Sequence, residues 1–130
     1  MPDAKEKEIL LVEDDKFLST LLSNRLTKFD YNVVVIGDGI EAIQYLKNHK
    51  PNLILVDIIL PGISGFEVLR EMRSNPQLKE SPVIIISNLG QDEDIKTGKE
   101  LGAVEYFVKA KTPIDQLVET IGSYLKKGTK

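Results

Sequence analysis

The sequence contains no cysteine. This absence excludes disulfide bonds, thiolate zinc sites and a cysteine nucleophile, and it fits a reducing compartment such as the cytoplasm. His49 is the only histidine, and a single imidazole cannot build a metal site alone. No apolar run approaches the roughly 18 residues that a membrane span requires. The charged start of the chain also lacks the apolar segment of a secretory signal. We therefore expect a cytoplasmic protein without a membrane segment.

The sequence also has little excess charge of either sign. Twenty acidic residues against seventeen basic ones give a net charge of −3. This mildly acidic balance argues against general binding to nucleic acids or anionic membranes. The chain has 130 residues, of which 42% are hydrophobic and 28% charged, as in one globular domain. We expect a single domain over 1–130, with a core of about 8–126 and frayed polar ends at 1–7 and 127–130.

Five short apolar runs predict five β-strands. They cover residues 9–12, 33–36, 53–56, 83–86 and 106–108. The runs are rich in β-branched residues and show no polar alternation, which is typical of strands buried on both faces of a parallel sheet. Segments with helical spacing follow the strands, so strand and helix alternate five times. This order predicts an α/β fold made of βαβ units with right-handed crossovers.

The segment after the fifth run has the clearest helical spacing. Its apolar stripe consists of Ile114, Leu117, Val118, Ile121 and Leu125. We expect Thr112 to cap this helix, with Pro113 as its first residue and Asp115 completing a capping box.

Helices are predicted in the other connections as well. The first has a stripe of Leu18, Leu21, Leu22, Arg25 and Phe29. Ser64 and Glu67 frame a capping box ahead of the third. The fourth, near 92–101, has few large apolar residues, and Gly102 suits the position just after its end. Such a weakly packed helix opens more easily than a well-packed one.

Chemically active residues follow four of the five predicted strands. They are Glu13, Asp14 and Asp15 after the first, Asp57 after the third, Ser87 and Asn88 after the fourth, and Lys109 after the fifth. Ligands of an open parallel sheet bind at the carboxyl ends of its strands, so these side chains are expected to gather at one edge. Each residue alone has an ordinary structural explanation, and Asp15 is expected to cap the first helix. Their coincidence on four strands indicates a site.

Three of these residues, Glu13, Asp14 and Asp57, are acids that repel one another and need a compensating cation. Oxygen ligands without histidine or cysteine favour Mg²⁺ over zinc. Lys109 and Ser87 would face the cation from the other side, an arrangement that suits a phosphoryl group. Asp57 is a candidate nucleophile because carboxylates form acyl-phosphates.

Four stretches of the chain resemble the receiver domain of two-component response regulators. They are 9–15, 53–65, 82–87 and 102–109. The most specific feature is Asp57 followed by Pro61 and Gly65, with the acidic pair before it and Ser87 and Lys109 after it. The resemblance covers about 8–126. It implies a doubly wound, flavodoxin-like three-layer (βα)5 sandwich with a five-stranded parallel sheet in the order 2-1-3-4-5.

The resemblance also implies the chemistry of phosphorylation. Asp57 would be the phosphoacceptor, taking its phosphoryl group from a histidine kinase, a phosphotransfer protein or a small donor such as acetyl phosphate. Asp14 would bind Mg²⁺ (or Mn²⁺) directly and Glu13 through water. The backbone carbonyl of Ile59 would be a further ligand.

Three more residues receive roles from the resemblance. Lys109 and Ser87 would contact the oxygens of the phosphoryl group. Tyr106 would report the switch to the surface formed by the fourth helix, fifth strand and fifth helix, although packing alone also explains an aromatic residue in an edge strand.

The sequence departs from the family pattern at the edge of the expected site. Ala110 follows Lys109 where most members have proline, so the peptide bond there is expected to be trans or the loop strained. Asn88 replaces a small residue and is expected to narrow phosphoryl access. Ile59 and Leu89 place apolar side chains at positions that tune water access, which predicts slow loss of the phosphoryl group.

A receiver of this kind is a signalling module that assists its own phosphorylation and is not an enzyme. A pseudo-receiver acting as a protein-interaction module is an alternative, disfavoured because the acids, Ser87 and Lys109 are all present. A Mg²⁺-dependent phosphohydrolase is a second alternative, disfavoured because Ile59 stands where such enzymes often place a second acid. We expect an unidentified downstream protein, no direct contact with nucleic acid or membrane, and a monomer or phosphorylation-dependent dimer.

Overall fold

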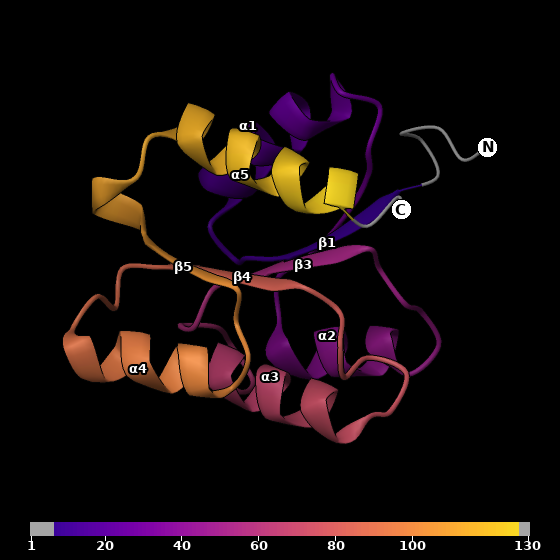
Figure 1. Ribbon diagram of the computed structural model, residues 1–130, viewed down its shortest axis with the longest axis vertical. Helices are drawn as coiled ribbons and strands as arrows, with labels where there is room; N and C mark the ends of the chain where they lie inside the picture. Colours follow the sequence, from indigo (N-terminus) through magenta and orange to yellow (C-terminus); the bar gives the residue numbers. More distant parts are fainter. Residues whose placement is uncertain (1–6, 128–130) are drawn as a thin grey trace.

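A five-stranded parallel sheet crosses the centre of the molecule (Figure 1). The computed structural model describes residues 7–127. The strands are β1 (Glu8–Val12), β2 (Asn32–Ile36), β3 (Leu53–Val56), β4 (Val83–Ser87) and β5 (Glu105–Val108). The helices are α1 (Lys16–Thr27), α2 (Gly39–Leu46), α3 (Gly65–Ser74), α4 (Asp92–Glu100) and α5 (Ile114–Lys127). The strand order β2-β1-β3-β4-β5 and the strand–helix alternation confirm the predicted fold.

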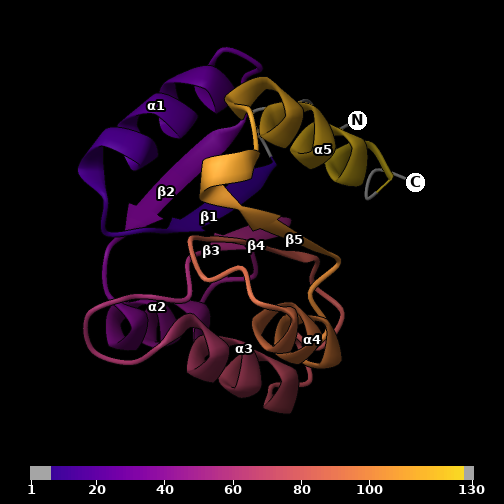
Figure 2. The same ribbon diagram turned by 90° about the vertical axis from the view of Figure 1, so that its left-hand side faces the viewer.

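The helices form two layers, one on each face of the sheet. Figures 1 and 2 show α1 and α5 on one face and α2, α3 and α4 on the other. Alternate residues of one strand enter opposite cores: Leu10 and Val12 pack toward the α2–α3 side, whereas Ile9 and Leu11 pack toward α1 and α5. All four are fully buried, which explains why β1 carries no polar alternation.

Side-chain caps fix where two of the helices begin. Asp15 accepts hydrogen bonds from the Phe17 and Leu18 amides, so it caps α1 as predicted. Ser64 caps α3 by accepting from the Glu67 amide at 3.3 Å. The carboxylate of Glu67 pairs with a neighbouring arginine, Arg70, and does not complete the predicted box.

The predicted start of the last helix was wrong by one residue. α5 begins at Ile114, and the Pro113 carbonyl accepts the first helical hydrogen bond from Leu117. The Thr112 hydroxyl donates to the Val108 carbonyl at 2.9 Å, because a short 3₁₀ turn (Lys109–Lys111) brings that carbonyl within its reach.

Two further residues depart from the expected pattern. Asp115 forms an ion pair with Arg25 across the α1–α5 layer and takes no part in a capping box. Phe29 lies beyond the end of α1 and is 57% exposed, whereas Leu26 is fully buried in its place.

The chain ends were predicted to be frayed. Lys7 is instead buried, and its ammonium group donates to the Leu125 carbonyl near the end of α5 at 3.3 Å. The rest of the predicted ends, 1–6 and 128–130, lies outside the described residues. Within 7–127, no helix combines the length and the apolar character needed to cross a membrane.

Candidate functional site

The sheet itself positions the two central acids. The Glu13 amide donates to the Ile36 carbonyl at 3.0 Å, and the Asp57 amide donates to the Val12 carbonyl at 2.9 Å. Both residues therefore continue the strand ladder one step past the last residues of β1 and β3. Because neighbouring strands are in register, their side chains emerge at the same edge of the sheet.

Three carboxylates meet at this edge. Glu13, Asp14 and Asp57 each offer an oxygen within 4.8 Å of the others. Glu13 and Asp57 are buried, with 2% and 4% exposure, whereas Asp14 is exposed. The acids predicted to follow separate strands thus form one cluster, in which Glu13 and Asp57 are buried and Asp14 faces the solvent.

Lys109 contacts both buried acids. Its Nζ donates to Asp57 Oδ2 at 2.7 Å and lies 2.8 Å from Glu13 Oε1. The residue leaves the end of β5 at the start of the 3₁₀ turn, so its side chain can reach back across β4 to β1 and β3. No cis bond occurs within 7–127, so the Lys109–Ala110 bond is trans.

Backbone amides hold the remaining oxygens of the same two acids. The Asp15 amide donates to Glu13 Oε2 at 3.0 Å, and the Ile59 amide donates to Asp57 Oδ1 at 3.2 Å. Each buried carboxylate is therefore fixed between an ammonium group and an amide. Such groups are oriented before any ligand arrives, which is the arrangement that favours phosphoryl transfer.

The environment shifts the pKa of Glu13 and that of Lys109. Burial raises the pKa of Glu13, and repulsion from Asp57 adds to this, against the lowering effect of Lys109 and the Asp15 amide. Burial alone would lower the pKa of Lys109, but its contacts with Asp57 and Glu13 raise it above the ordinary value. Lys109 is therefore charged at neutral pH.

Ser87 and Tyr106 meet through the loop after β4. Ser87 is fully buried, and its hydroxyl accepts a hydrogen bond from the Leu89 amide at 3.3 Å. The Tyr106 hydroxyl donates to the carbonyl of the same Leu89. Burial, with the charges of Asp94 and Asp57, raises the pKa of Tyr106 to about 12. A displacement of this loop would therefore alter the hydrogen bonds of both Ser87 and Tyr106.

Residues at the start of α2 support the loop after Asp57. The Gly39 amide donates to the Pro61 carbonyl at 3.0 Å, and Asp38 caps α2 beside Gly62. Gly62 has a φ of +85°, which favours glycine. A Cβ at Gly65 would lie 2.2 Å from the Asp57 carbonyl oxygen. Asp38 and Gly39 are far from this loop in the sequence, so only the fold brings them into contact with it.

The predicted access-tuning residues differ in their exposure. Ile59 is 57% exposed and Asn88 is exposed, whereas Leu89 is half-buried and packs on the core beneath α2 and α3. Ile59 thus presents an apolar surface next to the acidic cluster.

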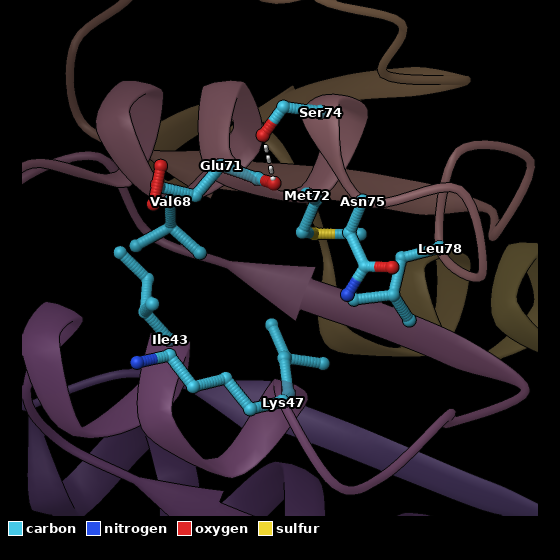
Figure 3. Close-up of a pocket in the computed structure, with 9 residues that line it drawn as sticks. Ile43, Lys47, Val68, Glu71, Met72, Ser74, Asn75 and Leu78 are labelled. Carbon is cyan, nitrogen blue, oxygen red and sulfur yellow. Dashed lines mark hydrogen bonds between the residues drawn. The ribbon is translucent and has the colours of Figure 1, made fainter.

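A separate cavity of about 190 Å³ lies between α2 and α3 (Figure 3). Ile43, Val68 and Met72 form its apolar part, and Lys47 and Glu71 lie at its polar margin. Its lining includes none of the residues of the candidate site, which are Glu13, Asp14, Asp57, Ser87 and Lys109, so the two are distinct.

The donor set fits a divalent cation. The three carboxylates carry three negative charges and Lys109 one positive charge, which leaves two negative charges. That remainder equals the charge of one divalent ion, and the exposed Asp14 gives the ion a route from solvent. Oxygen ligands alone suit Mg²⁺ or Mn²⁺.

A sequence profile described as response regulator receiver domain matches residues 9–122. The chain belongs to this family. It is a receiver domain of response regulators, the phosphoacceptor of two-component signalling. Nothing observed within 7–127 favours the pseudo-receiver alternative.

Curated relatives carry the same domain within longer proteins. The transcriptional regulatory protein AfsQ1 of Streptomyces coelicolor is 39% identical over 101 residues, which are 78% of this chain and 44% of that protein. The chain spans about half the length of the curated relatives it matches.

Solved receiver domains show the same architecture. The phosphorylated cyanobacterial phytochrome response regulator RcpA is 34% identical, with a TM-score of 0.79 over 90% of this chain and 89% of that one. The receiver domain of the sensor histidine kinase PA1611 from Pseudomonas aeruginosa holds magnesium in its active-site cleft. It is 26% identical, with a TM-score of 0.82 over 92% of this chain and 98% of that one.

Proposed function

We propose that Asp57 is the phosphoacceptor of this receiver domain. The observation that carries this proposal is the contact of Lys109 Nζ with Asp57 Oδ2 at 2.7 Å and with Glu13 Oε1 at 2.8 Å, inside a cluster of three carboxylates. Asp57 is the acid at the centre of this arrangement. One of its oxygens is held by Lys109 and the other by the Ile59 amide.

The donor of the phosphoryl group is a phosphohistidine of a histidine kinase or phosphotransfer protein, or a small acyl phosphate. An Asp57 oxygen forms a new P–O bond while the donor's P–N or P–O bond breaks, and the leaving group keeps the electron pair. Lys109 then neutralises one of the phosphoryl oxygens. Because the acceptor is already oriented, the chain contributes positioning and charge neutralisation.

Glu13, Asp14 and Asp57, together with the Ile59 carbonyl, would hold Mg²⁺ or Mn²⁺. The ion would supply the positive charge that lets an anionic donor approach an anionic acceptor. The support in this chain is the excess of two negative charges at the cluster and its oxygen-only donor set.

Phosphorylation would switch the molecule through Ser87 and Tyr106. A phosphoryl group adds about −1.5 to −2 charge with strong acceptor oxygens next to Lys109 and Ser87. Ser87 turning toward that group would give up the Leu89 amide, and the loop would then release the Tyr106 hydroxyl from the Leu89 carbonyl. The altered surface of α4, β5 and α5 would bind the downstream protein.

The remaining expectations belong to the same proposal. Residues 1–130 form one receiver domain with a core at about 8–126, acting in the cytoplasm as a monomer or a phosphorylation-dependent dimer. We propose that the described residues make no direct contact with nucleic acid. This proposal covers only those residues, because the relatives named as transcriptional regulators are about twice as long as this chain.

The test is the intact mass of the protein after incubation with acetyl phosphate and MgCl₂. Wild type is expected to gain one phosphoryl group, about 80 Da, and Asp57→Asn is expected to gain none. Asp15→Asn is the matched control, because Asp15 caps α1 beside the site and should still allow the gain. An equal gain in Asp57→Asn would refute the assignment. Turnover of phosphomonoesters by wild type would instead favour the phosphohydrolase alternative.

A further inference from the structure

Arg73 makes an unusual set of contacts at the edge of the sheet opposite the phosphorylation site. It projects from the last turn of α3 and is half-buried. Its guanidinium group donates to five backbone carbonyls of the described residues. They are Leu101 (3.0 Å, from Nε), Leu78 (3.2 Å), Lys79 (2.9 Å) and Ser81 (3.2 Å, all from Nη1), and Gly102 (3.0 Å, from Nη2).

These carbonyls belong to two segments that are far apart in the sequence. Leu101 and Gly102 end α4, and the other three lie in the connection from α3 to β4. Figures 1 and 2 show α3 and α4 side by side on one face of the sheet. The planar guanidinium group of Arg73 thus joins α3 to the end of α4. Its positive charge lies next to the carbonyl end of that helix, where a cation is favourable.

The backbone after α4 passes close to the guanidinium group of Arg73. Gly102 has a φ of +94°, and a Cβ there would lie 2.8 Å from Arg73 Nε. Within the same half of the helix, a Cβ at Gly98 would lie 2.6 Å from Ile85 Cδ1 and 2.9 Å from a ring carbon of Tyr106. The C-terminal half of α4 is therefore both hydrogen-bonded to α3 and in close contact with β4 and β5.

Within 7–127, the N-terminal half of α4 receives no side-chain hydrogen bond from α3, β4 or β5. Gly98 is the only buried residue described in the helix, and the first turn consists of the acids Asp92, Glu93 and Asp94. The loop that precedes this half is tied to β5 through the Tyr106 hydroxyl and the Leu89 carbonyl. That bond lies next to Ser87, whereas the Arg73 contacts lie at the other end of the helix.

We infer that Arg73 anchors the C-terminal end of α4, so that switching moves the N-terminal half of the helix about a fixed end. The inference rests on the proposed function for the origin of the movement, and on the Arg73 contacts for the position of the fixed end. The surface offered to a partner would accordingly change at 88–97 and stay constant at 98–104.

Hydrogen exchange followed by mass spectrometry tests this inference. In wild type, adding beryllofluoride, a phosphoryl analogue, with MgCl₂ should alter exchange at 88–97 and leave 98–104 unchanged. In Arg73→Lys, which keeps the charge and loses the fork, the change should extend into 98–104. Arg70→Lys is the matched control, because Arg70 lies one turn earlier in α3 and its guanidinium group pairs with Glu67 of the same helix.

The ligand-free proteins give a second, independent reading. Arg73→Lys should exchange about tenfold faster than wild type at 98–104 and 75–82, with no change at 88–97. Equal rates in the two proteins would overturn the anchor. A wild-type response to beryllofluoride that already covers 98–104 would overturn the fixed end without reliance on any variant. If beryllofluoride alters no wild-type peptide, the proposed function fails, and the ligand-free comparison still decides the role of Arg73.

Discussion

At the scale of single residues, the positive charge of Lys109 partly neutralises the buried carboxylates of Glu13 and Asp57. Lys109 is 17% exposed as a side chain, and the carboxylates it contacts are buried. A buried charge that loses its partner is costly, since neither water nor another group replaces the contact. The same balance leaves room for a divalent cation, because the single ammonium group does not neutralise three acids.

Replacement of Lys109 by glutamine should therefore destabilise the protein in a cation-dependent way. Without Mg²⁺ we expect the free energy of unfolding to fall by about 2–4 kcal/mol, because Glu13 and Asp57 remain buried without the ammonium group. Saturating MgCl₂ should stabilise Lys109→Gln more than wild type, since the ion takes over the neutralisation. Urea unfolding with and without MgCl₂ measures both effects.

The exposed Lys111 provides the control for this comparison. Lys111→Gln should unfold like wild type in both conditions. An identical response of Lys109→Gln and wild type to MgCl₂ would contradict the proposed cation site.

Ile59 should slow the loss of the phosphoryl group by limiting the approach of water. After removal of acetyl phosphate, we expect the phosphorylated form of wild type to persist for minutes or longer. Ile59→Asn should shorten this lifetime roughly threefold or more, because a polar side chain can orient water next to Asp57. Intact mass followed over time measures the decay.

Ile40→Asn is the matched substitution for this experiment, because Ile40 is similarly exposed, at 48%, but lies in the first turn of α2. It should decay like wild type. Loss of the phosphoryl group from wild type within seconds would show that the apolar rim does not restrict water.

Residue-level prediction worked where the strand order alone decides position. Glu13, Asp57 and Lys109 each follow a strand of a parallel sheet, so their meeting at one edge was predictable, while their individual roles stay predictions. Arg73 could not be identified in this way. Its five acceptors are backbone carbonyls, which have no sequence signature, and they come from two connections whose paths depend on packing.

At the scale of elements, the start of α3 presses against the end of β3. The Cβ that Gly65 lacks would lie 2.2 Å from the Asp57 carbonyl oxygen, and the Gly65 amide donates to the Ile58 carbonyl at 2.9 Å. The close approach of helix and strand fixes the path of the chain on either side of Asp57. Only glycine allows it, because the contact is with backbone atoms that cannot rotate away.

Gly65→Ala should therefore cost about 2–3 kcal/mol of unfolding free energy and lower the rate of phosphorylation by acetyl phosphate. Gly122→Ala is the matched control, since a Cβ at that position in α5 meets only the Tyr31 hydroxyl at 3.8 Å. The control should gain about 0.5–1 kcal/mol, as expected for alanine in a helix. Thermal and urea unfolding distinguish the two; a Gly65→Ala protein as stable as wild type would contradict the close packing.

The existence of the elements was predictable, but some of their ends were not. Apolar periodicity located the strands and helices, because burial dictates it directly. The start of α5 depended on contacts outside the helix, because Thr112 donates to the Val108 carbonyl and Asp115 pairs with Arg25. At the end of α1, Leu26 is buried where Phe29 was expected.

At the scale of the whole molecule, a few polar contacts join the layers around the two apolar cores. Tyr45 of α2 donates to Glu8 Oε2 at the start of β1, at 2.8 Å. Burial, together with the hydrogen bond to Glu8 and its charge, raises the pKa of Tyr45 to about 12. The folded state therefore favours the neutral phenol more strongly than the unfolded chain does.

This contact should make stability fall in alkaline solution. The contribution of Tyr45 is fully present below its unfolded pKa, near 10, and is lost as the pH rises toward the folded value of about 12. The unfolding free energy of Tyr45→Phe should decline less between pH 9 and 11 than that of wild type, with Glu8→Gln in between. Urea titrations across this range give the slopes, and parallel slopes for wild type and Tyr45→Phe would exclude the linkage.

The sequence alone was enough to predict the sheet, its two helical layers and the edge where the acids, Ser87 and Lys109 collect. The strands, the alternating helices and their common edge follow from hydrophobic periodicity and from the shared direction of parallel strands, whereas the doubly wound layers and the strand order were implied by the resemblance to the receiver family. The tertiary structure alone decided the Lys7–Leu125 tie, the grip of Arg73 on the end of α4 and the fit of Gly65 against Asp57. Those contacts join backbone groups of distant segments, so they exist only once packing has brought the segments together.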